Sequence, residues 1–173
     1  MPVDPETFLF TDDGETPNNP RLPLLVYRAA VDVKHAADPA VPFEQAFARH
    51  GWGDGWRNGI FGFLHFHTGT HEALGIARGR AKVEFGGANG RVFDVAAGDV
   101  VVLPAGCGHR RIEGSADLLV VGAYPEGSPS DHQRPDPARH AAAVAAVART
   151  PVPAEDPLFG REGPLSRLWR TGN

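Results

Sequence analysis

Between residues 56 and 124, short apolar runs alternate with turns rich in glycine. Each run is only three to seven residues long, which suits strands better than helices. The glycine-rich stretch 86–90 is a strong signal for a hairpin turn. Seven strands at this close spacing are typical of an all-β sandwich or barrel. The predicted strands are residues 60–66, 72–77, 81–85, 91–95, 100–103, 110–112 and 118–124.

The segments on either side of this region are expected to pack on the barrel. Before it, apolar runs at 8–10 and 24–28 predict two short strands, and the pattern at 42–50 predicts a short helix. After it, the alanine-rich stretch 138–149 predicts a second helix that ends before Pro151. The expected organisation is an arm with one helix at 1–55, a barrel core at 56–125 and a segment with one helix at 126–173.

Composition narrows the class of protein. The 21 glycines and 16 prolines favour many short strands joined by turns. The net charge is −4 and lysine and arginine form no stripe, which argues against nucleic acid as a partner. No apolar run is long enough to span a membrane, and the acidic start does not resemble a secretory signal. With Cys107 as its one cysteine, the chain is expected to be soluble and cytoplasmic.

Two histidines stand two residues apart in the predicted strand 60–66 and its continuation. Alternate residues of a strand point to the same side, so His65 and His67 would face one space. Phe61 and Phe63 share that parity and would line the same interior. A pair of imidazoles on one face, followed closely by an acid, indicates a metal site more than a packed core.

The acid that follows is Glu72, beyond a turn at residues 68–70. If the chain reverses there, Glu72 begins the next strand and faces back toward the histidines. His71 is the alternative, because a shift of one residue in register exchanges the two side chains. We favour Glu72 as the inward residue, which would leave His71 to face the substrate or to support the ligands.

The spacing of these residues resembles the two motifs of the cupin superfamily. Glu113 stands where the second motif usually ends in asparagine, a residue that is not a metal ligand in that family. The matching positions are Gly59, His65, His67, Glu72 and Gly79 in the first motif, and Gly98, Pro104, Gly106 and His109 in the second.

Longer stretches of sequence are similar to small bacterial cupins of the YjlB-like family. The resemblance to this family implies no particular reaction. The resemblance implies an all-β cupin fold, a double-stranded β-helix or jelly-roll barrel, with short flanking helices. The stretches that carry it are residues 56–59, 71–75, 102–111 and 121–127.

The resemblance also implies the ligands of one divalent metal ion: His65, His67, Glu72 and His109. Three neutral imidazoles and a carboxylate suit Fe(II), Mn(II), Ni(II), Cu(II) or Zn(II) better than Mg(II) or Ca(II). An octahedral metal would keep two positions for water, oxygen or substrate. Arg111 has the parity of His109, so it either meets a substrate carboxylate or lies on the rim as a surface arginine.

Three functions fit these features. The first is a metal-dependent enzyme, oxygenase-like, acting on a small organic substrate. The second is a metal-dependent isomerase, epimerase or lyase, and the third is a non-catalytic cupin that binds a small molecule. We also expect a homodimer, because small cupins pair through barrel edges and the N-terminal arm is able to add a strand to a partner.

Overall fold

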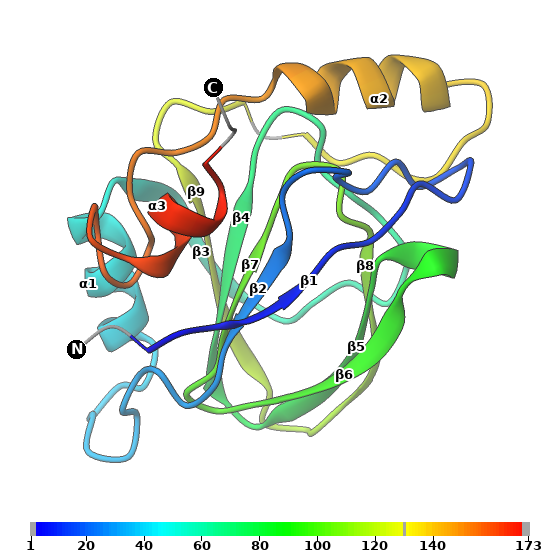
Figure 1. Ribbon diagram of the computed structural model, residues 1–173. Coiled ribbons are helices and arrows are strands. Elements are labelled where there is room, and N and C mark those ends of the chain that lie inside the picture. The colour runs from blue at the N-terminus through cyan, green and yellow to red at the C-terminus, as the bar shows by residue number, and fades with distance from the viewer. Residues whose placement is uncertain (1–2, 130, 171–173) are drawn as a thin grey trace.

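In the computed structural model, nine antiparallel strands form two sheets that face each other (Figure 1). The structure describes residues 3–129 and 131–170. The larger sheet has the order β1-β2-β7-β4-β9-β3 and the smaller one the order β6-β5-β8. The strands are β1 (Glu6–Phe8), β2 (Leu24–Tyr27), β3 (Trp52–Asn58), β4 (Glu72–Arg78), β5 (Arg80–Phe85), β6 (Arg91–Ala96), β7 (Val100–Leu103), β8 (His109–Gly114) and β9 (Leu119–Pro125).

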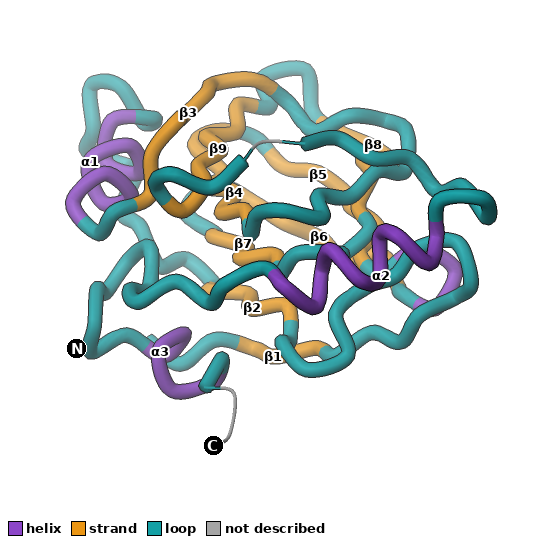
Figure 2. The backbone as a smooth tube through the Cα atoms, turned by 90° about the horizontal axis from the view of Figure 1, so that it is seen from above, coloured by secondary structure: helices purple, strands orange, loops and turns teal. Residues whose placement is uncertain are grey.

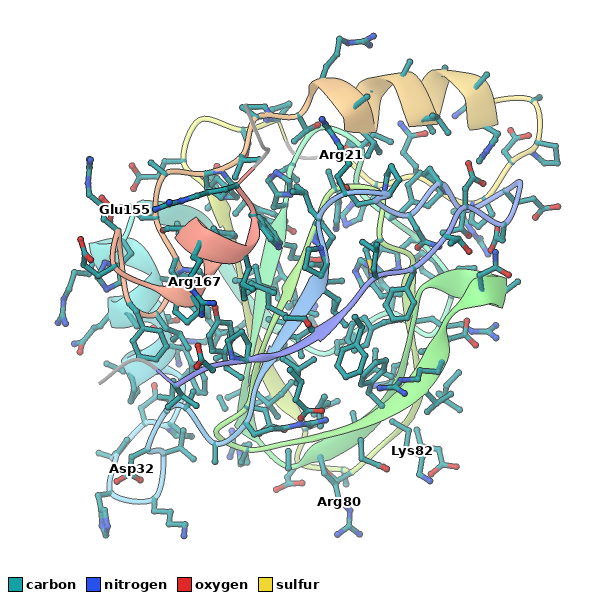
Figure 3. All side chains as sticks on the ribbon, in the orientation of Figure 1. Arg21, Asp32, Arg80, Lys82, Glu155 and Arg167 are labelled. Carbon is teal, nitrogen blue, oxygen red and sulfur yellow. The ribbon has the colours of Figure 1, made fainter. Side chains whose placement is uncertain are left out.

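The central strands of the larger sheet, β2, β7, β4 and β9, are covered on both faces, whereas the strands of the smaller sheet are not. In β4, Leu74 and Ile76 belong to the core between the sheets, and Ala73 and Ala77 belong to a second core on the outer face. In β5, by contrast, buried and polar positions alternate. The side chains of Arg80 and Lys82 point away from the barrel (Figure 3).

Three α-helices lie outside the barrel, and a short 3-10 helix, Gly87–Asn89, lies between β5 and β6. The α-helices are α1 (Val41–Arg49), α2 (His140–Arg149) and α3 (Pro164–Leu168). The buried side chains Phe43 and Phe47 of α1 pack into the outer core of the larger sheet. Seen from above, α2 crosses one end of the barrel (Figure 2). None of the helices in the described residues is long and apolar enough to cross a membrane.

The flanking segments are built into the barrel more than the sequence suggested. β1 and β2 are hydrogen-bonded strands of the larger sheet, and β3 begins at Trp52, so the predicted boundary at residue 56 falls inside a strand. Helix α3 was not predicted. Its neighbour Trp169 is fully buried and donates an indole hydrogen bond to the carbonyl of Pro23.

The predicted strand at residues 60–66 is wrong. His65 and His109 exchange two backbone hydrogen bonds of 3.2 and 2.9 Å, and the N–H of Arg111 donates to the carbonyl of Phe61 at 2.8 Å. Residues 62–64 therefore lie opposite Arg110 alone, and the chain bulges outward there. The predicted inward placement of Phe61 and Phe63 assumed a regular alternation, which the bulge interrupts. Phe61 and Phe63 are 47% and 38% exposed and stack on each other at 4.8 Å.

Candidate metal centre

The four predicted ligands come together at one place between the two sheets. His65 and His67 follow the bulge, Glu72 is the first residue of β4 and His109 is the first residue of β8. Each is at most 4% exposed. The backbone pairing of His65 with His109 joins the two cupin motifs in space, although 43 residues separate them along the chain.

All three histidines are held through Nδ1 by a backbone carbonyl. Nδ1 of His65 lies 3.0 Å from the carbonyl oxygen of Phe63, and Nδ1 of His109 lies 3.1 Å from that of Cys107. Nδ1 of His67 contacts the carbonyl oxygen of Asp131. A carbonyl only accepts, so each Nδ1 carries a proton, which leaves each Nε2 as the ring atom that would bind a metal.

Glu72 brings the carboxylate to the same point. Its Oε2 lies 3.2 Å from Nε2 of His67 and 3.1 Å from Nε2 of His109. The ligand atoms of these three residues all lie within 4.8 Å of one another. A buried carboxylate among imidazole nitrogens has the donor chemistry of a transition-metal site. The residues present therefore fit a divalent ion.

Burial and charge act in opposite directions on the pKa values of this cluster. Burial would raise the pKa of Glu72, but the charges of His67 and His109 and the hydrogen bonds with them hold it below its ordinary value. Burial, reinforced by the neighbouring His109, lowers the pKa of His65 to about 3. His65 is therefore neutral at pH 7, as a metal ligand must be.

A fifth residue, His132, was missed by the sequence analysis. It lies in the loop after β9, and its ligand atom lies within 4.8 Å of those of His65 and His67. His67 thus belongs to two sets of three potential ligands, one with Glu72 and His109 and one with His65 and His132. The local sequence carries no signal for this placement, because it depends on the path of a loop more than 60 residues downstream of His67.

The structure places His71 away from the cluster. Its ring lies 4.8 Å from that of Trp169 on the outer side of the larger sheet. Nδ1 accepts the N–H of Ala105 at 2.9 Å, and Nε2 lies 3.1 Å from the carbonyl of Pro151. Both ring nitrogens are occupied by the main chain, so the predicted substrate-facing role of His71 is wrong. Glu72 is the inward residue of the pair.

A cavity of about 780 Å³ opens above the cluster. Its walls include Phe61 and Arg111, two of the predicted substrate-binding residues, but not Phe63. Phe63 lies outside it, under the guanidinium of Arg134 at 4.7 Å. The other lining residues include Trp56, Ile60, His65, Glu72, Leu74, His109, Leu118, Tyr124 and His132.

Two groups beside the cluster are held in their neutral forms. Burial, with a smaller effect of the charge on Glu72, raises the pKa of the Tyr124 hydroxyl, which accepts a hydrogen bond of 3.0 Å from Nε1 of Trp56. Burial also raises the pKa of the Cys107 thiol to about 12. Cys107 is therefore a packed, protonated residue at pH 7 and not a nucleophile.

The fold and the two spaced motifs make this chain a cupin. It belongs to the family of the uncharacterised protein YjlB of Bacillus subtilis (strain 168), to which it is 37% identical over 169 residues, a match that covers 98% of this chain and 99% of that one. No family model matches the chain.

Solved structures resemble the chain more distantly. A mutant of oxalate decarboxylase OxdC from Bacillus subtilis matches at 18% identity with a TM-score of 0.39, over 65% of this chain and 27% of that one. A structure of DMSP lyases matches at 18% identity with a TM-score of 0.38, over 47% of this chain and 41% of that one. The matched parts thus span less than half of either of those chains.

Proposed function

We propose that the protein is a metal-dependent enzyme that holds one divalent transition-metal ion through His65, His67, Glu72 and His109 and acts on a small organic acid. The observation that carries the proposal is the position of the cluster. Four buried donors, three of them with oriented imidazoles, line or adjoin the floor of a cavity of about 780 Å³. A metal ion with a purely structural role in the barrel would not need an open cavity above it.

Arg111 supports an acidic substrate. Its side chain lines the cavity, and its guanidinium forms no ion pair with any residue that the structure describes. Neighbouring Arg110, by contrast, pairs with Glu84 at 3.0 Å. A free guanidinium matches a carboxylate with two parallel hydrogen bonds. Arg111 would thus fix the far end of a substrate whose other end approaches the donors.

The apolar wall would serve the chemistry by excluding water. Ile60, Phe61, Leu74 and Leu118 line the cavity around the polar groups. In such a space a bound ion supplies Lewis-acid or redox activation. We favour an oxygenase, because an octahedral ion with four protein ligands keeps positions for both the substrate and oxygen.

One observation favours the alternative of an isomerase, epimerase or lyase. Tyr124 lines the cavity, and its hydroxyl is held protonated beside Glu72. A protonated phenol is able to donate a proton to a developing anion, a step that these reactions need and that consumes no oxygen. A non-catalytic cupin that binds a small molecule remains the third reading.

The test begins with apo-protein loaded separately with Fe(II), Mn(II), Ni(II) or Zn(II). Each form is screened against keto acids, thiols, catechols and sugars while oxygen uptake and product mass are followed together. Turnover with oxygen uptake supports an oxygenase. Turnover with Zn(II) and no uptake moves the protein to the isomerases and lyases, and binding without turnover supports the third reading. Failure to bind any of the four metals would overturn the proposal.

Arg111 is tested with a matched neighbour. R111Q should raise KM for an acidic substrate about tenfold or more, since a charged hydrogen bond contributes roughly 1.5–3 kcal/mol. R110Q is the control, because Arg110 pairs with Glu84 and does not line the cavity. Equal KM values for R111Q and the unmodified protein would remove Arg111 from the site.

A further inference from the structure

The loop after β9 is fastened across the first cupin motif by three consecutive residues, 131–133, here called the strap. Gln133 and Phe66 exchange two backbone hydrogen bonds, each 2.9 Å long. The carboxylate of Asp131 accepts the N–H of Thr68 at 3.0 Å, the N–H of Gly69 at 3.1 Å and the hydroxyl of Thr68 at 2.8 Å. The strap is therefore fixed on both sides of His132.

Strand-like alternation places the middle residue of the strap over the cluster. Phe66 and Gln133 form a bridge, so the residues next to them, His67 and His132, share the opposite side. The ring centroid of His132 lies 5.0 Å from that of His67 and 5.8 Å from that of His65. The side chain lines the cavity above the buried donors.

The ring of His132 has no other evident task. No described residue forms a hydrogen bond or an ion pair with its nitrogens. Its one other aromatic neighbour outside the cluster is Phe61, edge to face at 5.7 Å. An imidazole that is positioned by its backbone, free at both nitrogens and next to two candidate ligands is suited to bind the same ion.

We propose that His132 is a fifth protein ligand, supplied to the metal by the strap. The inference rests on the proposed function, since it requires an ion at the cluster. The ligand atoms of His65, His67 and His132 lie within 4.8 Å of one another. Two nitrogens bound to one ion at about 2.1 Å each are at most about 4.2 Å apart, so the nitrogens of these three histidines lie within about 1 Å of the separation that a shared ion requires.

A fifth ligand changes what the site offers to substrate. An octahedral ion with His65, His67, Glu72, His109 and His132 keeps one open position instead of two. A substrate that binds through two atoms must then displace His132, which is the most exposed of the five. The fifth ligand would also tie the C-terminal part of the chain to the metal through Asp131 and Gln133.

The experiment compares H132A and H132F with the unmodified protein after loading with Co(II). H132F keeps an aromatic ring against Phe61 and removes the donor nitrogens, which separates ligation from packing. H35Q is the control, because His35 is exposed, lies in the loop between β2 and α1, and is not part of either ligand set. The measurements are Co(II) affinity by competition with a chromophoric chelator and the visible Co(II) absorption spectrum.

Both His132 variants should lose Co(II) affinity about tenfold or more, because even residues that only support a ligand contribute that much. Both should also change the position and intensity of the Co(II) bands, and H35Q should change neither. Affinity and spectrum equal to the unmodified protein in H132F would overturn the inference. In that case a severe loss in H67A would still support the metal site, whereas an unmodified protein that binds no Co(II) would overturn both proposals.

Discussion

At the scale of single residues, the site depends most on His67. It is the member shared by both sets of potential ligands. Its Nδ1 contacts the carbonyl of Asp131, and its Nε2 lies 3.2 Å from Oε2 of Glu72. Burial alone would lower the pKa of His67, but Glu72 and Asp131 together raise it above its ordinary value. This residue therefore joins the strap, the carboxylate and the other imidazoles.

We expect H67A to lose most of its bound metal, and H109A to do likewise, because each removes an oriented imidazole from a buried donor set. The measurement is metal content per chain after equilibration with one equivalent of Zn(II), with folding checked by circular dichroism. H35A serves as the control for loss of a histidine as such. Full metal content in folded H67A and H109A would contradict the ligand assignment.

The spacing of residues was enough to predict which side chains come together, but not which of them belongs to two sets of potential ligands. The two motifs predicted His65, His67, Glu72 and His109, and the structure brings these four together. Counting could not decide between His71 and Glu72, because the turn at 68–70 resets the alternation. The start of β4 at Glu72 decides it. His132 was beyond prediction because hydrogen bonds made by the strap, and not its own sequence, place it there.

At the scale of elements, strand prediction succeeded where alternation was regular and failed where a bulge intervened. Strands β4 to β9 lie within two residues of the predicted ranges. The run 60–66 was apolar enough to predict a strand, but its pairing with β8 is interrupted by three residues opposite one. The same bulge turns Phe61 toward the cavity mouth. Periodicity alone does not reveal this, because a bulge is a property of the pair of strands.

The contact of α1 with the larger sheet depends on a glycine. A Cβ at Gly75 would lie 2.3 Å from Cδ1 of the fully buried Phe43. We therefore expect G75A to lower the free energy of unfolding by about 1–3 kcal/mol, the usual cost of overpacking a core. Urea unfolding measures it. G55A is the control, since a Cβ at Gly55 would meet the carbonyl oxygen of Gly122 only at 3.4 Å. An unchanged midpoint in G75A would show that α1 shifts freely on the sheet.

Asp13 joins the N-terminal arm to the turn between β5 and β6. Its carboxylate accepts the N–H of Glu15 at 3.0 Å, of Thr16 at 2.6 Å and of Ala88 at 2.9 Å. Partial burial would raise the pKa of Asp13, but these three backbone donors hold it below its ordinary value. The charged form of Asp13 is thus more stable in the folded protein than in the unfolded chain.

Because the pKa of Asp13 is lowered by folding, the stability of the protein depends on pH. The stabilisation by Asp13 is fully present above the unfolded pKa of about 3.9 and is lost as the pH falls through the lower folded value. We expect D13N to be less stable than the unmodified protein at pH 7, by about 1–2 kcal/mol, and the difference to shrink below pH 4. Urea unfolding at pH 7, 5 and 3.5 measures it, with E15Q as the control. A difference that stays constant over this range would show that the charge of Asp13 does not matter.

At the scale of the whole molecule, the larger sheet ends in a strand with an open side. β1 pairs with β2 only, and Glu6 and Thr7 are exposed along it. The arm that was expected to reach a partner therefore adds its strand to its own sheet. An edge strand of this kind remains able to pair with the same strand of a second copy about a two-fold axis. The homodimer thus stays a prediction, now with a definite surface.

We expect light scattering at micromolar concentration to give a mass of twice the chain's 18.5 kDa. T7K should shift the mass toward the monomer, because a two-fold pairing of β1 would bring two new charges together at its centre, and lysine on an edge strand opposes pairing. V92K is the matched control: Val92 is 51% exposed on β6, the edge strand of the smaller sheet. A monomeric mass for the unmodified protein would contradict the dimer. If V92K breaks the dimer and T7K leaves it intact, the contact lies on β6 of the smaller sheet. That strand is hydrogen-bonded to β5 and not to the strands that carry Glu72 or His109.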